Sequence, residues 1–304
     1  MSWRLAIRWT CLVLAAVLLT RASTRLFAQE PSLADILAKA AREAAVFADP
    51  ARLIECDERY QQINLKVRAL VGFSTGTGAG PQNQVEGVPT DKREWIADLV
   101  VVATPDNEPL GQPWMEFRDI LTVNGKAMHN GVSRLGALAS KPISVAGVDA
   151  LKYTRDNTSQ RFGRFIRGPL LPRLIQLVFH ASNQKRFDLR KGGARVIDGI
   201  KTIEVKFQEK AKPSIFGASD GSDTFLEGSA WIDPENGHVV QSLLKNGDSD
   251  TLKNEMTVTY GLDQESGLWV PKDMKDVTID NDEGTRVEAT GTFTKWRIVP
   301  RTAR

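Results

Sequence analysis

The chain has 304 residues, of which 41% are hydrophobic and 25% are charged, a composition typical of globular proteins. Its formal net charge of +3 reflects 40 Lys and Arg against 37 Asp and Glu, but four of the arginines and none of the acids lie in residues 1–28. The rest of the chain therefore has 36 basic residues against 37 acidic ones. This balance removes the main support for a nucleic-acid-binding protein.

Residues 1–28 have the three parts of a secretory signal peptide. Arg4 and Arg8 supply positive charge ahead of an apolar run, Trp9–Thr20, which is too short to span a bilayer comfortably. Ala28 then offers a small residue at the cleavage point. We predict cleavage after Ala28 and a periplasmic or secreted protein; an uncleaved N-terminal anchor is the alternative.

The cysteine count limits how the fold is stabilised. Cys11 lies within the apolar run, so cleavage leaves Cys56 as the sole cysteine and excludes an intrachain disulfide. A hydrophobic core must then stabilise the fold. No later stretch is apolar enough to cross a membrane, so no transmembrane segment is expected in residues 29–304. These residues are expected to form a single α+β domain.

The first predicted elements are a helix and a strand. Ser32 is a suitable N-cap for a helix that runs to Phe47, and Asp49-Pro50 would end it. Alternating apolar residues then predict a half-buried strand over Ile54–Val71. The phase of this alternation changes along the strand, so a β-bulge is expected near Gln61-Gln62.

The middle of the chain combines strands, a loop and an insert. Residues 72–89 are rich in Gly and are expected to form a flexible loop. Strands are predicted at Trp95–Ala103 and Trp114–Val123, and the following Asn124-Gly125 is a strong tight-turn signal. Residues 130–180 are predicted to be a mainly helical insert.

From Gln184 onward the sequence predicts only strands. Apolar and polar residues alternate, and turn signals such as Asp198-Gly199 and Asp233–Gly237 separate the runs. Strands joined by short turns are antiparallel neighbours. The expected fold class is α+β, with a strongly curved antiparallel sheet and helices on one face.

Few residues suggest catalysis or metal binding. His129, His180 and His238 have no His or Cys neighbour at metal-ligand spacing, and the G-x-S-x-G and G-x-x-x-x-G-K motifs are absent. We expect no metal and no cofactor. A basic run over residues 185–195 alternates with apolar residues, which favours a solvated strand face over a patch for anionic lipid or an acidic partner.

One polar face is the best candidate for enzymatic chemistry. Glu58, Tyr60 and Gln62 share a face of their predicted strand, so they could line a polar cleft. Glu58 would then act as the general base of a hydrolase. The alternative is a structural carboxylate that hydrogen-bonds to a neighbouring strand.

Two sets of motifs resemble known families. Asp57–Gln62, Trp114–Ile120 and Val123–Gly125 resemble the E-x-Y-x-Q, W-x-x-F-R-D-V and V-D-G pattern of an uncharacterised family of exported bacterial proteins. Gly228–Val240 and Gly267–Met274 look like the C-terminal sheet of that family, which is similar to the outer-membrane lipoprotein-carrier (LolA/LolB-like) fold. The resemblance implies a half-open barrel whose concave face, covered by helices, holds acyl chains in the carriers. The chain departs from carriers in its long N-terminal portion and its insert.

Three functions remain open at this point. The first is non-enzymatic binding of a lipid, a lipoprotein acyl chain or another hydrophobic ligand on the concave side of the sheet. The second is an envelope scaffold with a filled core, and the third is the Glu58 hydrolase. The residues expected to line a cavity are the inward positions of the C-terminal strands, namely Ile203, Val205, Phe207, Trp231, Met256 and Val258.

Overall fold

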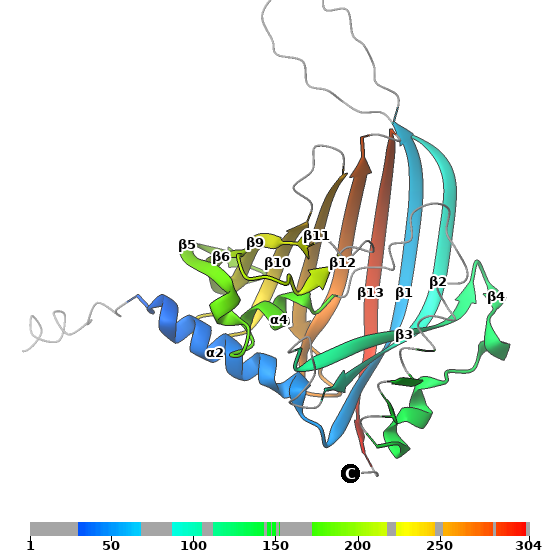
Figure 1. Cartoon of the computed structure of the whole chain (residues 1–304), viewed down its shortest axis with the longest axis horizontal. Helices are drawn as coiled ribbons and strands as arrows, with labels where there is room; N and C mark the ends of the chain where they lie inside the picture. Colours follow the sequence, from blue (N-terminus) through cyan, green and yellow to red (C-terminus); the bar gives the residue numbers. More distant parts are fainter. Residues whose placement is uncertain are drawn as a thin grey trace, which may run out of the picture. The chain divides into compact units, whose positions relative to one another are not determined.

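The computed structural model describes residues 30–67, 87–104, 112–142, 145–146, 148–149, 152, 172–217, 223–246, 252–281 and 284–301. The chain divides into two compact units, Met1–Ser32 and Leu33–Arg304, and all elements named below belong to the second. A large antiparallel sheet with few helices dominates that unit (Figure 1).

The main sheet has eleven strands in the order β4-β3-β2-β1-β13-β12-β11-β10-β9-β6-β5, and every neighbouring pair is antiparallel. It is strongly curved but not closed, so β4 and β5 are its edges (Figure 1). Two short strands, β7 and β8, pair separately. The strands are β1 (Arg52–Val67), β2 (Gly87–Ala103), β3 (Trp114–Val123), β4 (Lys126–Ala127), β5 (Phe187–Ile197), β6 (Ile200–Glu209), β7 (Phe216–Gly217), β8 (Asp223–Thr224), β9 (Leu226–Ile232), β10 (Val239–Asn246), β11 (Leu252–Leu262), β12 (Trp269–Asp280) and β13 (Thr285–Pro300).

The described helices are short apart from the first. They are α2 (Leu33–Ala45), α4 (Leu174–Phe179) and the 3₁₀-helices η1 (Val46–Ala48), η2 (His129–Gly131), η3 (Leu135–Ser140) and η4 (Gln184–Arg186). None of the helices in this part of the chain has the length and apolar character needed to span a bilayer.

The sequence dictates which face of α2 is buried. Ile36, Ala40 and Ala44 recur every four residues and therefore form one buried stripe, which Phe47 continues into η1. The helix begins directly after Ser32, as predicted. The side chains of Ala40 and Ala44 are small, so other backbone segments can approach this face of α2 closely.

Both α2 and α4 share a core with one face of the sheet. Their buried side chains belong to the same cluster as those of β1, β6, β9, β11, β12 and β13. The side-chain amide nitrogen of Gln184 fixes the two helices, because it donates hydrogen bonds to the carbonyl oxygens of Leu37 at 3.1 Å and Phe179 at 2.9 Å. We call the sheet face that joins this core the inner face.

The opposite face of β1, β2 and β3 carries a second, smaller core. Leu135 and Leu138 of η3 pack there against Val100 and Phe117. Consecutive residues of β3 therefore serve different cores, because side chains alternate across a strand. The insert contributes η3 to the outer face and α4 to the inner core, so its described residues support both sides of the sheet.

Several sequence predictions can be compared directly with these elements. The strand at Trp114–Val123 has the predicted bounds, and the Asn124-Gly125 turn is confirmed by positive φ angles of 49° and 76°. The bulge expected near Gln61-Gln62 is wrong: the pairing of β1 shifts between Glu55 and Asp57 and again between Asn64 and Leu65. The apolar residues of different phase simply face opposite sides of one long strand.

Of the loop predicted over residues 72–89, only residues 87–89 are among the described residues. Gly87, Val88 and Pro89 belong to β2, which begins well before the predicted Trp95. The remainder of that segment lies outside the described residues. The additional part of β2 was missed because both of its faces are polar and show no hydrophobic alternation.

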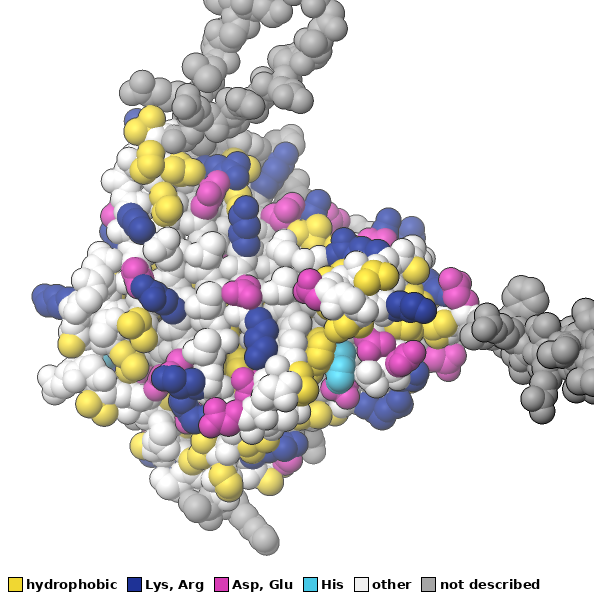
Figure 2. All heavy atoms as spheres, turned by 180° about the vertical axis from the view of Figure 1, so that it is seen from behind, with side chains coloured by type: hydrophobic (Ala, Val, Ile, Leu, Met, Phe, Trp, Pro, Cys, Tyr) yellow, Lys and Arg dark blue, Asp and Glu magenta, His cyan; other side chains and the backbone are white. Residues whose placement is uncertain are grey.

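The basic run in β5 and its surroundings is largely paired within the chain. Arg190 forms an ion pair with Asp188 at 2.5 Å, and Arg186 forms one with Glu209 at 3.3 Å. On the face seen from behind, acidic and basic side chains are interspersed (Figure 2). This arrangement agrees with a solvated strand face rather than a binding patch for anions.

Candidate functional site

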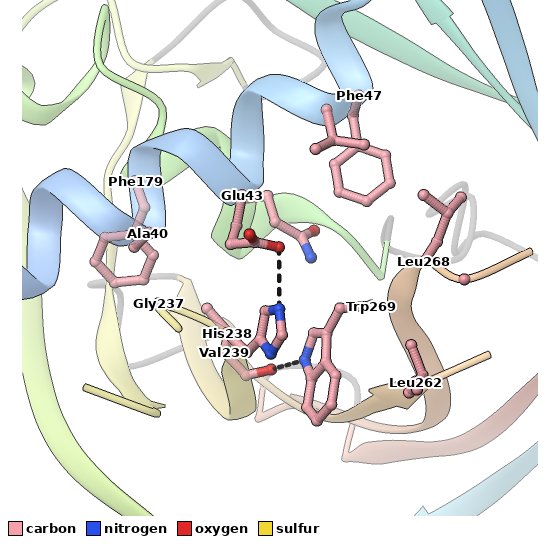
Figure 3. Close-up of a pocket in the computed structure, with 13 residues that line it drawn as sticks. Ala40, Glu43, Phe47, Phe179, Gly237, His238, Val239, Leu262, Leu268 and Trp269 are labelled. Carbon is pink, nitrogen blue, oxygen red and sulfur yellow. Dashed lines mark hydrogen bonds and ion pairs between the residues drawn. The ribbon is translucent and has the colours of Figure 1, made fainter. Parts of the chain in front are cut away.

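A pocket of about 290 Å³ lies between α2, α4 and two turns of the sheet, the β9–β10 turn and the β11–β12 turn (Figure 3). We call it the α2 pocket. Its volume is close to the lower end of the roughly 300–1,000 Å³ range of small-molecule sites. Most of its wall is apolar, formed by Ala40, Val46, Phe47, Phe179, Val239, Leu262, Leu268 and Trp269.

The β9–β10 turn reaches the backbone of α2 because it contains a glycine. Gly237 has a φ of +87°, and a Cβ added there would lie 2.4 Å from the carbonyl carbon of Lys39. The Lys39 ammonium also donates a hydrogen bond to the carbonyl oxygen of Pro234 at 2.6 Å. The turn and the helix are thus held together at one side of the pocket.

The β11–β12 turn has the same construction. In each turn a glycine amide donates to an aspartate carbonyl oxygen at 2.8 Å: Gly237 to Asp233, and Gly267 to Asp263. Both turns place the first residues of the following strand at the pocket, which brings Val239 and Trp269 side by side. The indole nitrogen of Trp269 donates to the carbonyl oxygen of Val239 at 2.7 Å.

A polar pair connects α2 to the turn wall. His238 Nε2 lies 3.2 Å from a carboxylate oxygen of Glu43, and the imidazole stacks on the Trp269 indole with ring centroids 4.4 Å apart (Figure 3). Both polar side chains are partly exposed, with 39% of the Glu43 side chain accessible. They therefore lie at the rim of the pocket, beside the exposed Leu262.

A third polar side chain lies deeper. Gln176 of α4 lines the pocket but is only 6% exposed, and its amide oxygen has no hydrogen-bond partner among the described residues. A buried amide oxygen that accepts no hydrogen bond is costly. Among the described lining residues there is one acid, Glu43, and no Lys or Arg.

The cavity predicted from the sequence is not at this location. Ile203, Val205, Phe207, Met256 and Val258 are buried in the inner core and do not line the α2 pocket. The expectation that Trp231 faces inward is wrong, because its neighbours Ala230 and Ile232 are the buried residues of β9. The Trp231 ring lies on the outer face, with the guanidinium carbon of Arg195 3.7 Å from its centroid.

In the predicted polar face, the carboxylate of Glu58 is already bound within the chain. Glu58 is 1% exposed and accepts two hydrogen bonds from Arg118, one of them 2.8 Å long. Tyr60 stacks on Trp95 with centroids 4.1 Å apart, and Gln62 donates to a neighbouring Asn. A carboxylate with both oxygens bound to a buried guanidinium is arranged as a structural ion pair.

A second buried pair lies nearby, between β3 and the start of α4. Arg173 is fully buried between the rings of Phe47 and Trp296, with its guanidinium carbon 3.9 Å and 4.4 Å from their centroids. One of its nitrogens lies 3.5 Å from Glu116, and burial raises the pKa of that carboxyl to about 7. The adjoining space of about 10 Å³ is on the scale of a single water molecule.

Sequence reasoning missed the residues of the α2 pocket. At the level of sequence, His238 is considered only as a possible metal ligand, and no pattern links it to Glu43 or Gln176. A usable signal was the similarity of Asp233–Gly237 to Asp263–Gly267, two turns of equal length that end in glycine. No three His, Cys, Asp or Glu side chains of the described residues gather in the manner of a metal site.

No protein-family model matches the chain, and no curated protein matches it. Solved structures similar to it include a DUF1329 family protein from Desulfovibrio piger, with 12% identity over 88% of this chain and 93% of that one and a TM-score of 0.34. An outer-membrane lipoprotein-sorting protein domain from Vibrio parahaemolyticus has 10% identity, 86% and 91% coverage and a TM-score of 0.38. A LolA superfamily protein from Nitrosomonas europaea has 12% identity, 86% and 92% coverage and a TM-score of 0.33. These are similarities to solved structures only, and they assign no ligand or activity to this chain.

Proposed function

We propose that the protein binds a hydrophobic ligand, a lipid or the acyl chain of a lipoprotein, in the α2 pocket. The observation that carries this proposal is the apolar wall between α2 and the two glycine turns, with Leu262 and Trp269 at its rim. Large apolar side chains left accessible beside a hollow favour an apolar ligand, since burying them removes hydrocarbon from water. In this proposal the curved sheet is a half-open barrel, and α2 and α4 cover its concave face.

We further propose that this binding takes place outside the cytoplasm. The support is the signal-like composition of residues 1–28. Cleavage after Ala28 would remove residues 1–28 and leave α2 with its buried stripe intact, since the helix begins at Leu33. N-terminal sequencing of protein from the cell envelope tests this part.

A titration with N-phenyl-1-naphthylamine tests the binding proposal. This uncharged dye becomes fluorescent in apolar surroundings, so saturable binding by the wild type is expected. Leu262→Glu places a charge at the pocket rim and should weaken binding about tenfold, which corresponds to roughly 1.4 kcal/mol. Leu262 is 46% exposed, so the substitution should leave the fold intact.

Val196→Glu is the matched control. Val196 is 64% exposed in the edge strand β5, does not line the α2 pocket, and changes to the same residue. It should bind the dye as the wild type does. Equal weakening by both substitutions, or no binding by the wild type, would contradict the proposal.

A further inference from the structure

The rim of the α2 pocket holds a carboxylate that is accessible and only partly paired. Glu43 Oε2 lies 3.2 Å from His238 Nε2, whereas Oε1 has no hydrogen-bond or ion-pair partner among the described residues. The Glu43 side chain lines the pocket and is 39% exposed, and Figure 3 shows its carboxylate directed toward His238 across the pocket. This carboxylate can therefore accept a further hydrogen bond from a ligand that enters the pocket.

The charges around Glu43 disfavour an anionic ligand. Among the described lining residues there is no Lys or Arg, and the basic side chain that is present, His238, already directs its Nε2 at the Glu43 carboxylate. Lys39, the one lysine of α2, donates to the carbonyl oxygen of Pro234. A ligand carboxylate or phosphate would thus approach the Glu43 charge without a lysine or arginine in the described lining to offset the repulsion.

A purely apolar ligand is also disfavoured at this rim, because it would remove water from the Glu43 carboxylate and replace it with hydrocarbon. A ligand ammonium would replace that water with a charge-assisted hydrogen bond, roughly twice as strong as one from an uncharged hydroxyl. The amide of Gln176, which also lines the pocket, has both donor and acceptor groups and no formal charge. It therefore does not select between ligand charges, and Glu43 does.

We propose that the α2 pocket selects a cationic amphiphile, in which one apolar chain lies along the apolar wall and an ammonium head binds Glu43 at the rim. This inference rests on the proposed function, because it assigns the ligand class of the same pocket. It makes Glu43 a specificity-determining residue as well as the partner of His238. The partial exposure of Glu43 suits this arrangement, since the ammonium head can keep part of its hydration while the chain is buried.

Three probes of equal carbon number test this class at pH 7: decylammonium, 1-decanol and decanoate. Each displaces bound N-phenyl-1-naphthylamine at concentrations below those at which it forms micelles. The wild type should bind decylammonium about three- to fivefold more tightly than decanol, the range expected of an ion pair that stays partly exposed. Decanoate should bind more weakly than decanol, because it places a second negative charge beside Glu43.

Glu43→Gln removes the charge while keeping the side-chain length, and it should make the affinities for decylammonium and decanol equal. Glu265→Gln is the matched control, because Glu265 is an exposed acid of the β11–β12 turn that does not line the pocket. This variant should keep the preference of the wild type. The selectivity of the wild type is itself a test, so the inference can be judged even where Glu43→Gln fails to fold.

Equal wild-type affinities for decylammonium and decanol, or a preference for decanoate, would overturn the inference and leave the binding proposal standing. A preference for decylammonium that Glu43→Gln retains, or that Glu265→Gln loses to the same extent, would also overturn it, since the ammonium would then not bind Glu43. Failure of both the dye and decanol to bind would instead overturn the proposed function.

Discussion

The carboxylate of Glu58 on β1 and the guanidinium of Arg118 on β3 meet across the intervening strand β2, and both are buried. Ala97 of β2, which pairs with Glu58 in the register of the sheet, is small enough to leave space for the two long side chains. The pair explains why two motifs about sixty positions apart in the sequence contain complementary charges. It also locks three neighbouring strands together on the inner face.

This ion pair gives a first prediction. Glu58→Gln should lower the free energy of unfolding by about 3 kcal/mol or more, because it removes the carboxylate charge that is bound to the buried Arg118 guanidinium. The double substitution Glu58→Leu with Arg118→Met should come within about 1–2 kcal/mol of the wild type, since it removes both charges. Denaturant titrations of the three proteins measure these differences. A Glu58→Gln protein as stable as the wild type would favour the general-base role and contradict the structural one.

The two faces of the sheet give a second prediction. Trp296 is fully buried in the inner core, so Trp296→Ala should cost about 3–5 kcal/mol. Trp231 lies half-buried beneath Arg195 on the outer face, so Trp231→Ala should cost only about 1–2 kcal/mol, mostly from the lost contact with the guanidinium. Midpoints of urea unfolding compare the two. Equal losses would place Trp231 in the core, as the sequence alone suggested.

The two turn glycines provide a third prediction with an internal control. Gly237→Ala and Gly267→Ala both place a side chain at positive φ, which costs about 1 kcal/mol in each case. Only Gly237 is pressed against α2, whereas a Cβ at Gly267 meets nothing within 4 Å. Gly237→Ala should therefore be clearly more destabilising, and it should weaken dye binding by moving the turn away from Lys39. Thermal melts and dye titrations that fail to distinguish the two variants would contradict the close approach of turn and helix.

The buried carboxyl of Glu116 gives a fourth prediction, on pH. Burial raises its pKa to about 7, whereas a Glu in an unfolded chain titrates near about 4.3. Between these values the folded protein retains a proton that the unfolded chain has released. Its contribution to stability is therefore complete below about pH 4.3 and is lost as pH rises through about 7, a change on the order of 3 kcal/mol.

Glu116→Gln should remove this slope, so the variant should gain stability relative to the wild type as pH rises from 5 to 8. Glu255→Gln is the control, because the Glu255 side chain is 55% exposed and substitution there should leave the slope unchanged. Urea titrations at several pH values provide the comparison. If the difference in unfolding free energy between the wild type and Glu116→Gln did not change with pH, the raised pKa of Glu116 would be refuted.

Local patterns predicted much of the sheet, because one buried face imposes alternation on each strand. The bounds of Trp114–Val123 and the inward positions Val205, Met256 and Val258 follow from that rule. Alternation alone could not orient β9, where the buried face is marked by a small Ala230 and the large Trp231 is outside. The large Trp231 ring led to the expectation that this residue faces inward, whereas in the structure the Arg195 guanidinium lies over the ring on the outer face.

The α2 pocket could not be predicted from local sequence patterns. Its rim joins Glu43 to His238, nearly two hundred residues later, and its depth depends on Gln176 in a third segment. Only the order and register of the strands bring these residues together. The pairing of Glu58 with Arg118 has the same origin, since it depends on β2 lying between β1 and β3.

Photo-crosslinking with an uncharged alkyl diazirine alcohol tests the location of the bound ligand most directly. After irradiation and proteolysis, mass spectrometry identifies the labelled residues. Binding in the α2 pocket predicts adducts concentrated on peptides that contain Phe179, Leu262 and Leu268–Trp269, all lost in competition with excess 1-decanol. Adducts spread over exposed apolar residues such as Val132 and Val196, unaffected by the competitor, would contradict a ligand site between α2 and the turns.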